Sequence, residues 1–201
     1  MMRALVLAPV LLLGGCISLL PEPPPPPRVY VLEAADVAPA TAPQADVVVS
    51  VALPTGERSI LGTDLVWRTG DELAYVNQSQ WSSRAEQALQ TLLVETIIRQ
   101  GRFRAATRIG EGTATYEIRW DVLDFEVREE TMTARFAAEV RLVASPGRRI
   151  VAAQIITAEV PVAERSTAAA AQALARAARE GGARIGEFAA DAAEAQTPAA
   201  E

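Results

Sequence analysis

Three long runs of alternating apolar and polar residues fill much of the second half of the chain, at 114–122, 132–142 and 149–162. A period of two predicts β-strands that bury one face. Pro146 and Gly147 separate the second run from the third and are typical of a turn. The three runs therefore predict an antiparallel meander, which constrains the fold more than any other feature of the sequence.

The apolar phase changes inside the first of these runs. The alternation that reaches Val122 is followed by Leu123, Phe125 and Val127, so the apolar positions resume one residue out of step. A shift of one residue moves a side chain to the opposite face of a sheet. We therefore expect a β-bulge here, with Leu123, Phe125 and Val127 on the core face beyond it.

Shorter strands are predicted upstream. Residues 47–53 read as a strand that places Val47, Val49, Val51 and Leu53 on one face. Two more runs, Asp64 to Arg68 and Glu72 to Val76, flank the sequence Thr-Gly-Asp-Glu, which predicts a hairpin.

Two segments have the three-to-four residue spacing of an amphipathic helix. The first is predicted over Trp81 to Gln100, with Ser83 and Glu86 as a capping box and Gly101 as the residue that ends it. The second begins near Ser166 or Thr167. Gly181 and Gly182 in this helix leave two alternatives, a close approach to the sheet or a break in the helix.

Strands that are segregated from helices predict an α+β fold. We expect a single domain over residues 30–190, a twisted antiparallel sheet with two helices packed on one face, preceded by a signal peptide and a proline-rich linker. Residues 191–201 contain few large apolar side chains and are predicted to be a disordered tail. The charged residues along 119–141 indicate that the other sheet face is wet and carries cross-strand ion pairs.

The amino-terminal residues are not predicted to belong to this domain. Residues 1–15 have a positive start and a short apolar core, which is typical of a cleaved signal peptide and too short to span a bilayer. Residues 16–29 are rich in proline and predict an extended, semi-rigid tether. Cys16 is the single cysteine of the chain and stands at the junction of the two segments.

Composition excludes several kinds of chemistry. The chain has no histidine, and all 19 of its basic residues are arginine, so His-dependent catalysis, His/Cys zinc sites and lysine Schiff bases are unavailable to it. A site built from carboxylates alone remains open, and Asp121, Asp124 and Glu126 are its candidates; the alternative is a solvated strand face. The net charge of −6, which becomes −7 when Arg3 is removed with the signal peptide, argues against a nucleic-acid partner.

Two parts of the sequence resemble known families of proteins. Leu13-Gly14-Gly15-Cys16 resembles the lipobox of bacterial lipoproteins, which implies that Cys16 is the lipid attachment site; the alternative is a buried free cysteine. The order of motifs along 28–190 resembles the ABC-type transport auxiliary lipoprotein family. The motifs are Tyr30-Val31-Leu32, Tyr75 with Trp81, Gly101-Arg102-Phe103 and Asp124-Phe125-Glu126.

The family resemblance implies a non-enzymatic lipoprotein subunit of a phospholipid transport system in the cell envelope. The implied partners are an MCE-domain periplasmic protein and the ABC transporter subunits, with the lipid anchor in the outer membrane, the domain facing the periplasm, and a homo-oligomer as one state. No cofactor or metal is expected. Tyr75 and Trp81 are candidates for partner contact or for the core. The alternatives are an assembly or pilot lipoprotein of lipopolysaccharide export or of a secretin, and a carboxylate-only hydrolase.

Overall fold

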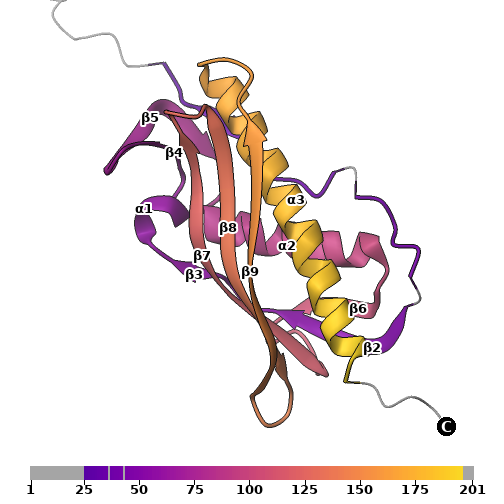
Figure 1. Ribbon diagram of the computed structural model, residues 1–201. Coiled ribbons are helices and arrows are strands. Elements are labelled where there is room, and N and C mark those ends of the chain that lie inside the picture. Colours follow the sequence, from indigo (N-terminus) through magenta and orange to yellow (C-terminus); the bar gives the residue numbers. More distant parts are fainter. Residues whose placement is uncertain (1–24, 36, 43, 197–201) are drawn as a thin grey trace, which may run out of the picture.

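A three-stranded antiparallel meander forms the centre of the protein (Figure 1). The computed structural model describes residues 25–35, 37–42 and 44–196. In it β7 (Tyr116–Arg128) pairs with β8 (Thr133–Ala144), and β8 pairs with β9 (Arg149–Pro161). The predicted meander is confirmed, as is the α+β class of the domain.

The bulge predicted in β7 is also confirmed. Val122 pairs with Ala138 and Asp124 pairs with Ala137, so Leu123 is the additional residue. The expectation that Leu123 lies on the core face is wrong, because this side chain is 47% exposed. The extra residue of a bulge leaves the ladder, and the buried alternation resumes only at Phe125 and Val127.

The rest of the sheet is mixed, so the prediction of a wholly antiparallel sheet is wrong. The predicted hairpin is present as β4 and β5. Three strands run parallel to β7, namely β2, β3 and β4. Two further parallel pairs are β2 with β6 and β1 with β5. Alternation in a sequence specifies the face of a strand but not its partner or direction, and so could not reveal this. The bounds are β1 (Arg28–Tyr30), β2 (Ala45–Val51), β3 (Thr55–Gly56), β4 (Asp64–Thr69), β5 (Glu72–Trp81) and β6 (Phe103–Arg108).

Helix α2 (Ala85–Gln100) starts later than predicted, because β5 continues as a strand through Trp81. The predicted capping box is wrong: the residue before the helix is Arg84, and its side chain makes no capping bond. The N–H of Ala85 instead donates to the carbonyl oxygen of Gly62, at 2.8 Å, just beyond the short helix α1 (Arg58–Leu61). The predicted end is confirmed, since Gly101 is left-handed (φ 70°) and its N–H donates to Ile97.

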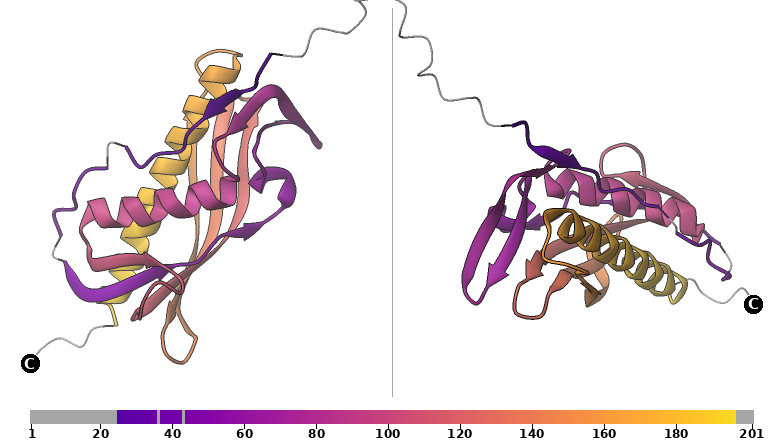
Figure 2. Two further views of the ribbon diagram at one scale, coloured as in Figure 1. Left: turned by 180° about the vertical axis from the view of Figure 1, so that it is seen from behind. Right: turned by 90° about the horizontal axis from the view of Figure 1, so that it is seen from above.

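Helix α3 (Thr167–Glu194) is continuous through its glycines, and Ser166 caps it by accepting a hydrogen bond from the N–H of Ala169. A Cβ at Gly181 would overlap the ring of Phe136 on β8. A Cβ at Gly182 would lie 3.0 Å from Leu92 of α2. Close approach is therefore the correct alternative. Figure 2 shows α2 and α3 crossing on the same side of the sheet.

The domain is longer than predicted at both ends. Its sheet starts at Arg28 rather than at residue 30. Helix α3 reaches Glu194, so a disordered tail from 191 is wrong for 191–194; residues 197–201 lie outside the described part. Ala190 and Ala193 are 0% and 1% exposed, so small side chains pack this end of the helix although the segment has few large apolar residues. Alanine is the best helix former and packs closely, although it adds little to a hydrophobic pattern.

Candidate functional site

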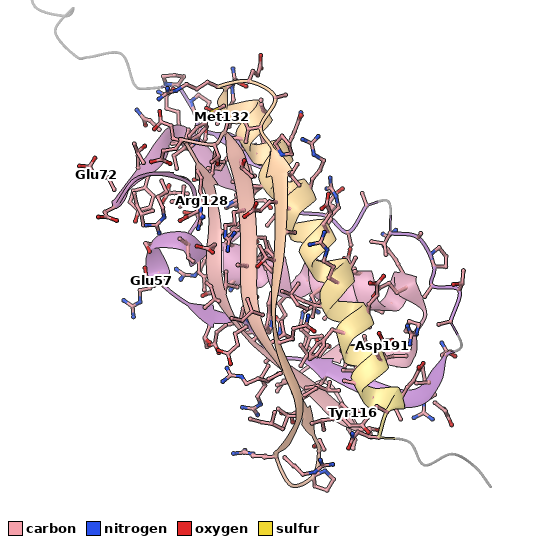
Figure 3. All side chains as sticks on the ribbon, in the orientation of Figure 1. Glu57, Glu72, Tyr116, Arg128, Met132 and Asp191 are labelled. Carbon is pink, nitrogen blue, oxygen red and sulfur yellow. The ribbon has the colours of Figure 1, made fainter. Side chains whose placement is uncertain are left out.

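The segments nearest to the predicted tether gather at one end of the protein, the tether-proximal end. It comprises β1, the β4–β5 hairpin, the β7–β8 turn at residues 129–132 and the start of α3. Glu72 at the hairpin tip and Met132 in the turn both lie at this end (Figure 3). Cys16 lies outside the described residues, so its lipid attachment stays a prediction.

The hairpin is fastened to the β7–β8 turn by two acidic residues. The N–H of Glu129 donates to the carbonyl oxygen of Arg68 at 2.9 Å, and its carboxylate accepts from Thr69 and pairs with Arg165. The carboxylate of Glu130 accepts from the N–H of Gly70 at 2.5 Å. Its own backbone N–H and that of Gly70 lower the pKa of Glu130 below its ordinary value. The hairpin is thus held to the sheet rather than projecting freely.

A groove of about 310 Å³ separates this hairpin from the start of α3. Tyr75 lies in its wall with 55% of its surface exposed. An exposed tyrosine beside a charged pair presents an apolar ring and a polar tip, a combination that is enriched where proteins bind partners. The lining residues are Trp67, Ala74, Tyr75, Val76, Glu129, Arg165, Ser166 and Thr167.

Trp81 has a different position from Tyr75, although both are on β5. Trp81 is 2% exposed and stacks on Phe125, with ring centroids 5.6 Å apart and planes at 26°. Phe125 in turn meets the edge of Phe136 at 6.5 Å. Trp81 is therefore a core residue, and Tyr75 is the one of the two that a partner can reach.

The three candidate carboxylates all bind arginine on the outer face of the sheet, away from the helices. Asp121 pairs with Arg141, and Asp124 pairs with Arg135 at 2.8 Å. Two of the directly opposite pairs carry like charges, since Arg119 faces Arg141 and Asp121 faces Glu139. The ion pairs therefore run diagonally across β7 and β8, as expected for a wet sheet face.

Glu126 is the buried member of this group, with 0% of its side chain exposed. Its Oε1 atom accepts from the Nε of Arg68 at 2.5 Å, and the Nε of Arg128 lies 3.8 Å away. The hydrogen bond to Glu126 raises the pKa of Arg68 above its ordinary value. Figure 3 places Arg128 on the part of β7 that leads to the tether-proximal end. The carboxylates thus act as ion-pair partners that join β4, β7 and β8.

Sequence reasoning missed the partners of these acids. Arg68 and Glu126 are 58 positions apart, and Arg165 and Glu129 are 36 apart, so no local spacing links them. The only available signal was the presence of a glutamate inside an apolar strand, since a buried carboxylate needs a cation. Within the described part of the chain, no cluster of three or more Cys, Asp or Glu residues is arranged to hold a metal ion. No helix of that part is long and apolar enough to cross a membrane.

Comparisons with known proteins found one matching family and several structures of similar fold. The family of ABC-type transport auxiliary lipoprotein components matches residues 30–186. A crystal structure from Xanthomonas campestris, of a protein assigned to family DUF330, superposes with a TM-score of 0.77 at 24% identity and covers 84% of this chain and 99% of its own. A second crystal structure, of an uncharacterized protein, has a TM-score of 0.66 at 14% identity and covers 82% and 99%.

No curated protein has a significant match to the sequence. The two structures are less than 25% identical to this chain, so they support its fold alone. The family match begins at Tyr30, the last residue of β1, and spans β2 to β9 and most of α3. The chain belongs to the family of ABC-type transport auxiliary lipoprotein components.

Proposed function

We propose that this protein is the membrane-anchored, non-enzymatic subunit of an ABC transporter system that moves phospholipid across the cell envelope. The family match over residues 30–186 is the observation that carries the proposal. Membership supports the general role of an auxiliary transport lipoprotein. The phospholipid cargo, an MCE-domain periplasmic partner and an outer-membrane location are the finer parts of the proposal.

The anchor in this proposal is Cys16, joined to the domain by the proline-rich tether. The path from Cys16 to Arg28 has 28 − 16 = 12 steps, so an extended tether reaches roughly 37 Å. Two or more acyl chains hold a protein stably on a bilayer, whereas one chain does so only weakly. The tether thus keeps the domain within reach of both the membrane and a periplasmic partner.

The chemistry of the domain supports a binding role rather than a catalytic one. Asp121, Asp124 and Glu126 each form an ion pair with an arginine, which is the arrangement of a structural ion-pair network. The Tyr75 groove offers an aromatic contact at the end from which the tether leaves. We propose this groove as the contact with a transport subunit.

Crosslinking in intact envelopes tests this function. A photo-crosslinking side chain at Tyr75 should capture an ABC or MCE-domain subunit. The matched control is Leu123, which is 47% exposed against 55% for Tyr75 but lies on the outer sheet face. Capture of a lipopolysaccharide-export or secretin component from position 75 would favour the alternative assembly role, and equal capture from both positions would contradict the proposed groove.

A further inference from the structure

A groove of about 340 Å³ lies between β1 and the first half of α3. Tyr30 and Val31 form one wall, and the other wall is formed by two buried alanines with Gln172, Arg176 and Arg179. These three polar residues are four and three positions apart, so they share one face of the helix. Figure 2 shows the chain that follows β1 passing across α3. The groove thus brings two arginines to the strand at which the tether enters the domain.

The two arginines give the groove a positive charge. Within the described ranges, no carboxylate lies within ion-pair distance of the side chain of Arg176 or Arg179, and none lines the groove. Residues 167–179 contain no Asp or Glu. Arg28, two residues before the groove, adds a third positive charge, and Glu33, two residues beyond it, is the acid that follows. The chain is acidic as a whole, but this part of its surface is basic.

A neighbouring groove of about 380 Å³ shares Arg176 and Arg179 and also contains two acids, Glu180 and Glu187. Glu180 pairs with Arg184 at 3.9 Å. Glu187 is eight positions beyond Arg179, which corresponds to about 12 Å along a helix. The acids of α3 therefore lie to one side and leave the arginines available to the β1 groove.

The chemistry of the β1 groove fits the phosphate of a phospholipid. Guanidinium groups bind phosphate through paired, charge-assisted hydrogen bonds. Val29 and Val31 are 54% and 55% exposed, and they lie on the same side of the chain because side chains alternate along a strand. This apolar surface beside the arginines suits the glycerol and acyl ester groups that adjoin a lipid phosphate. A free phosphate or an acidic peptide would make no use of it.

The position of the groove brings it to the membrane that holds the anchor. Tyr30 is two residues beyond Arg28, at which the sheet begins. A tether from Cys16 reaches roughly 37 Å when extended, and a tilted tether brings the groove down to the bilayer surface. Tethering also makes the contact intramolecular, with an effective lipid concentration on the order of millimolar for a short linker. A site of weak intrinsic affinity is then sufficient.

We propose that the groove between β1 and α3 binds the phosphate of an anionic phospholipid in the membrane that holds the anchor. Each arginine near an anionic surface strengthens such a contact about fivefold. The Tyr75 groove shares no lining residue with this one, so a protein partner and a lipid can bind together. The proposal rests on the anchor at Cys16, which is part of the proposed function, and not on the identity of the transported molecule.

Fluorescence of the full-length, acylated protein in vesicles tests the groove. A label that senses polarity is attached at Val29→Cys, beside the groove and at an exposed residue, while acylation leaves Cys16 without a free thiol. Two kinds of vesicle are compared, one of phosphatidylcholine alone and one that also contains phosphatidylglycerol. We expect the label to report a less polar environment in the second. Raising the salt from about 0.1 M to about 1 M shortens the Debye length to about 3 Å and should remove the difference.

Removal of the arginines provides the matched variants. Arg176→Gln combined with Arg179→Gln should weaken the contact on the order of 25-fold and abolish the effect of phosphatidylglycerol on the emission. Arg58→Gln combined with Arg99→Gln removes the same charge at exposed residues outside the groove and should preserve the effect. Should the double groove variant fail to fold, Arg176→Gln alone, at an exposed residue, should still weaken the contact about fivefold.

Failure of the groove and failure of the anchor give different results. A protein that stays on both kinds of vesicle but has the same emission in each would overturn the groove alone and would favour an acidic segment of a partner protein as its occupant. Equal losses in the groove variants and the control variant would also overturn it. A protein that stays on neither kind of vesicle would overturn the anchor, and with it the proposed function as well as the groove.

Discussion

Replacing Trp81 with alanine is the sharpest test of the core described above. Trp81 is 2% exposed, so the change removes nearly the whole indole from a packed interior. Substitutions of this kind cost about 3–5 kcal/mol, and the loss of the stack on Phe125 lies within this range. For a chain of this size each kcal/mol lowers Tm by about 2–4 °C, so we expect a decrease of roughly 6–20 °C.

The assay is thermal unfolding followed by circular dichroism, with Tyr75→Ala as the matched control. Tyr75 is on the same strand but is 55% exposed, so its truncation should shift Tm by no more than about 2 °C. Chemical denaturation of both variants gives the free energy of unfolding directly. Equal shifts for the two variants would refute the assignment of Trp81 to the core and Tyr75 to the surface.

Four further predictions follow from single residues. Gly181→Leu should lower Tm by more than 10 °C or prevent folding, since its side chain has no space against β8, whereas Gly112→Ala, in open space, should leave Tm unchanged. Glu126→Ala should lower the free energy of unfolding by about 1–3 kcal/mol in denaturant titrations. The loss is moderate because the partner, Arg68, is one-third exposed and can be hydrated when Glu126 is absent. An unchanged free energy of unfolding would mean that the ion pair does not stabilise the fold. The pKa of Glu130 in the folded protein lies below its ordinary value of 4.5. Ionised Glu130 therefore stabilises the fold above pH 4.5, and this stabilisation is lost as the pH falls through the folded pKa. Glu130→Gln should flatten this part of a plot of unfolding free energy against pH. Cys16→Ser should move the protein out of its normal membrane fraction, which density-gradient fractionation measures.

The meander could be predicted from the sequence because its signal is local. Alternation along β7, β8 and β9 specifies the buried face, and the shift after Val122 locates the bulge. Helix ends were predictable where the capping residue acts within its own chain segment, as at Ser166 and Gly101. The start of α2 was not, because its first N–H is satisfied by Gly62, which lies 85 − 62 = 23 positions earlier.

Features that depend on distant partners were not predictable. The parallel pairing of β2 and β4 with β7 requires knowledge of where the intervening chain crosses. The roles of Tyr75 and Trp81 were equivalent in sequence and became distinct only when β5 was placed at the sheet, with Trp81 against Phe125. The alanine-rich end of α3 was read as a tail because its burial comes from close packing rather than from large side chains.

The central proposal is that a lipid on Cys16 anchors the α+β domain at the membrane. Mass spectrometry of the amino-terminal peptide from the mature, membrane-derived protein tests it most directly. The account predicts that the chain begins at Cys16 and carries a diacylglyceryl thioether and an acylated amino group. A mature chain with an unmodified thiol at Cys16, or one that still retains residues 1–15, would contradict it.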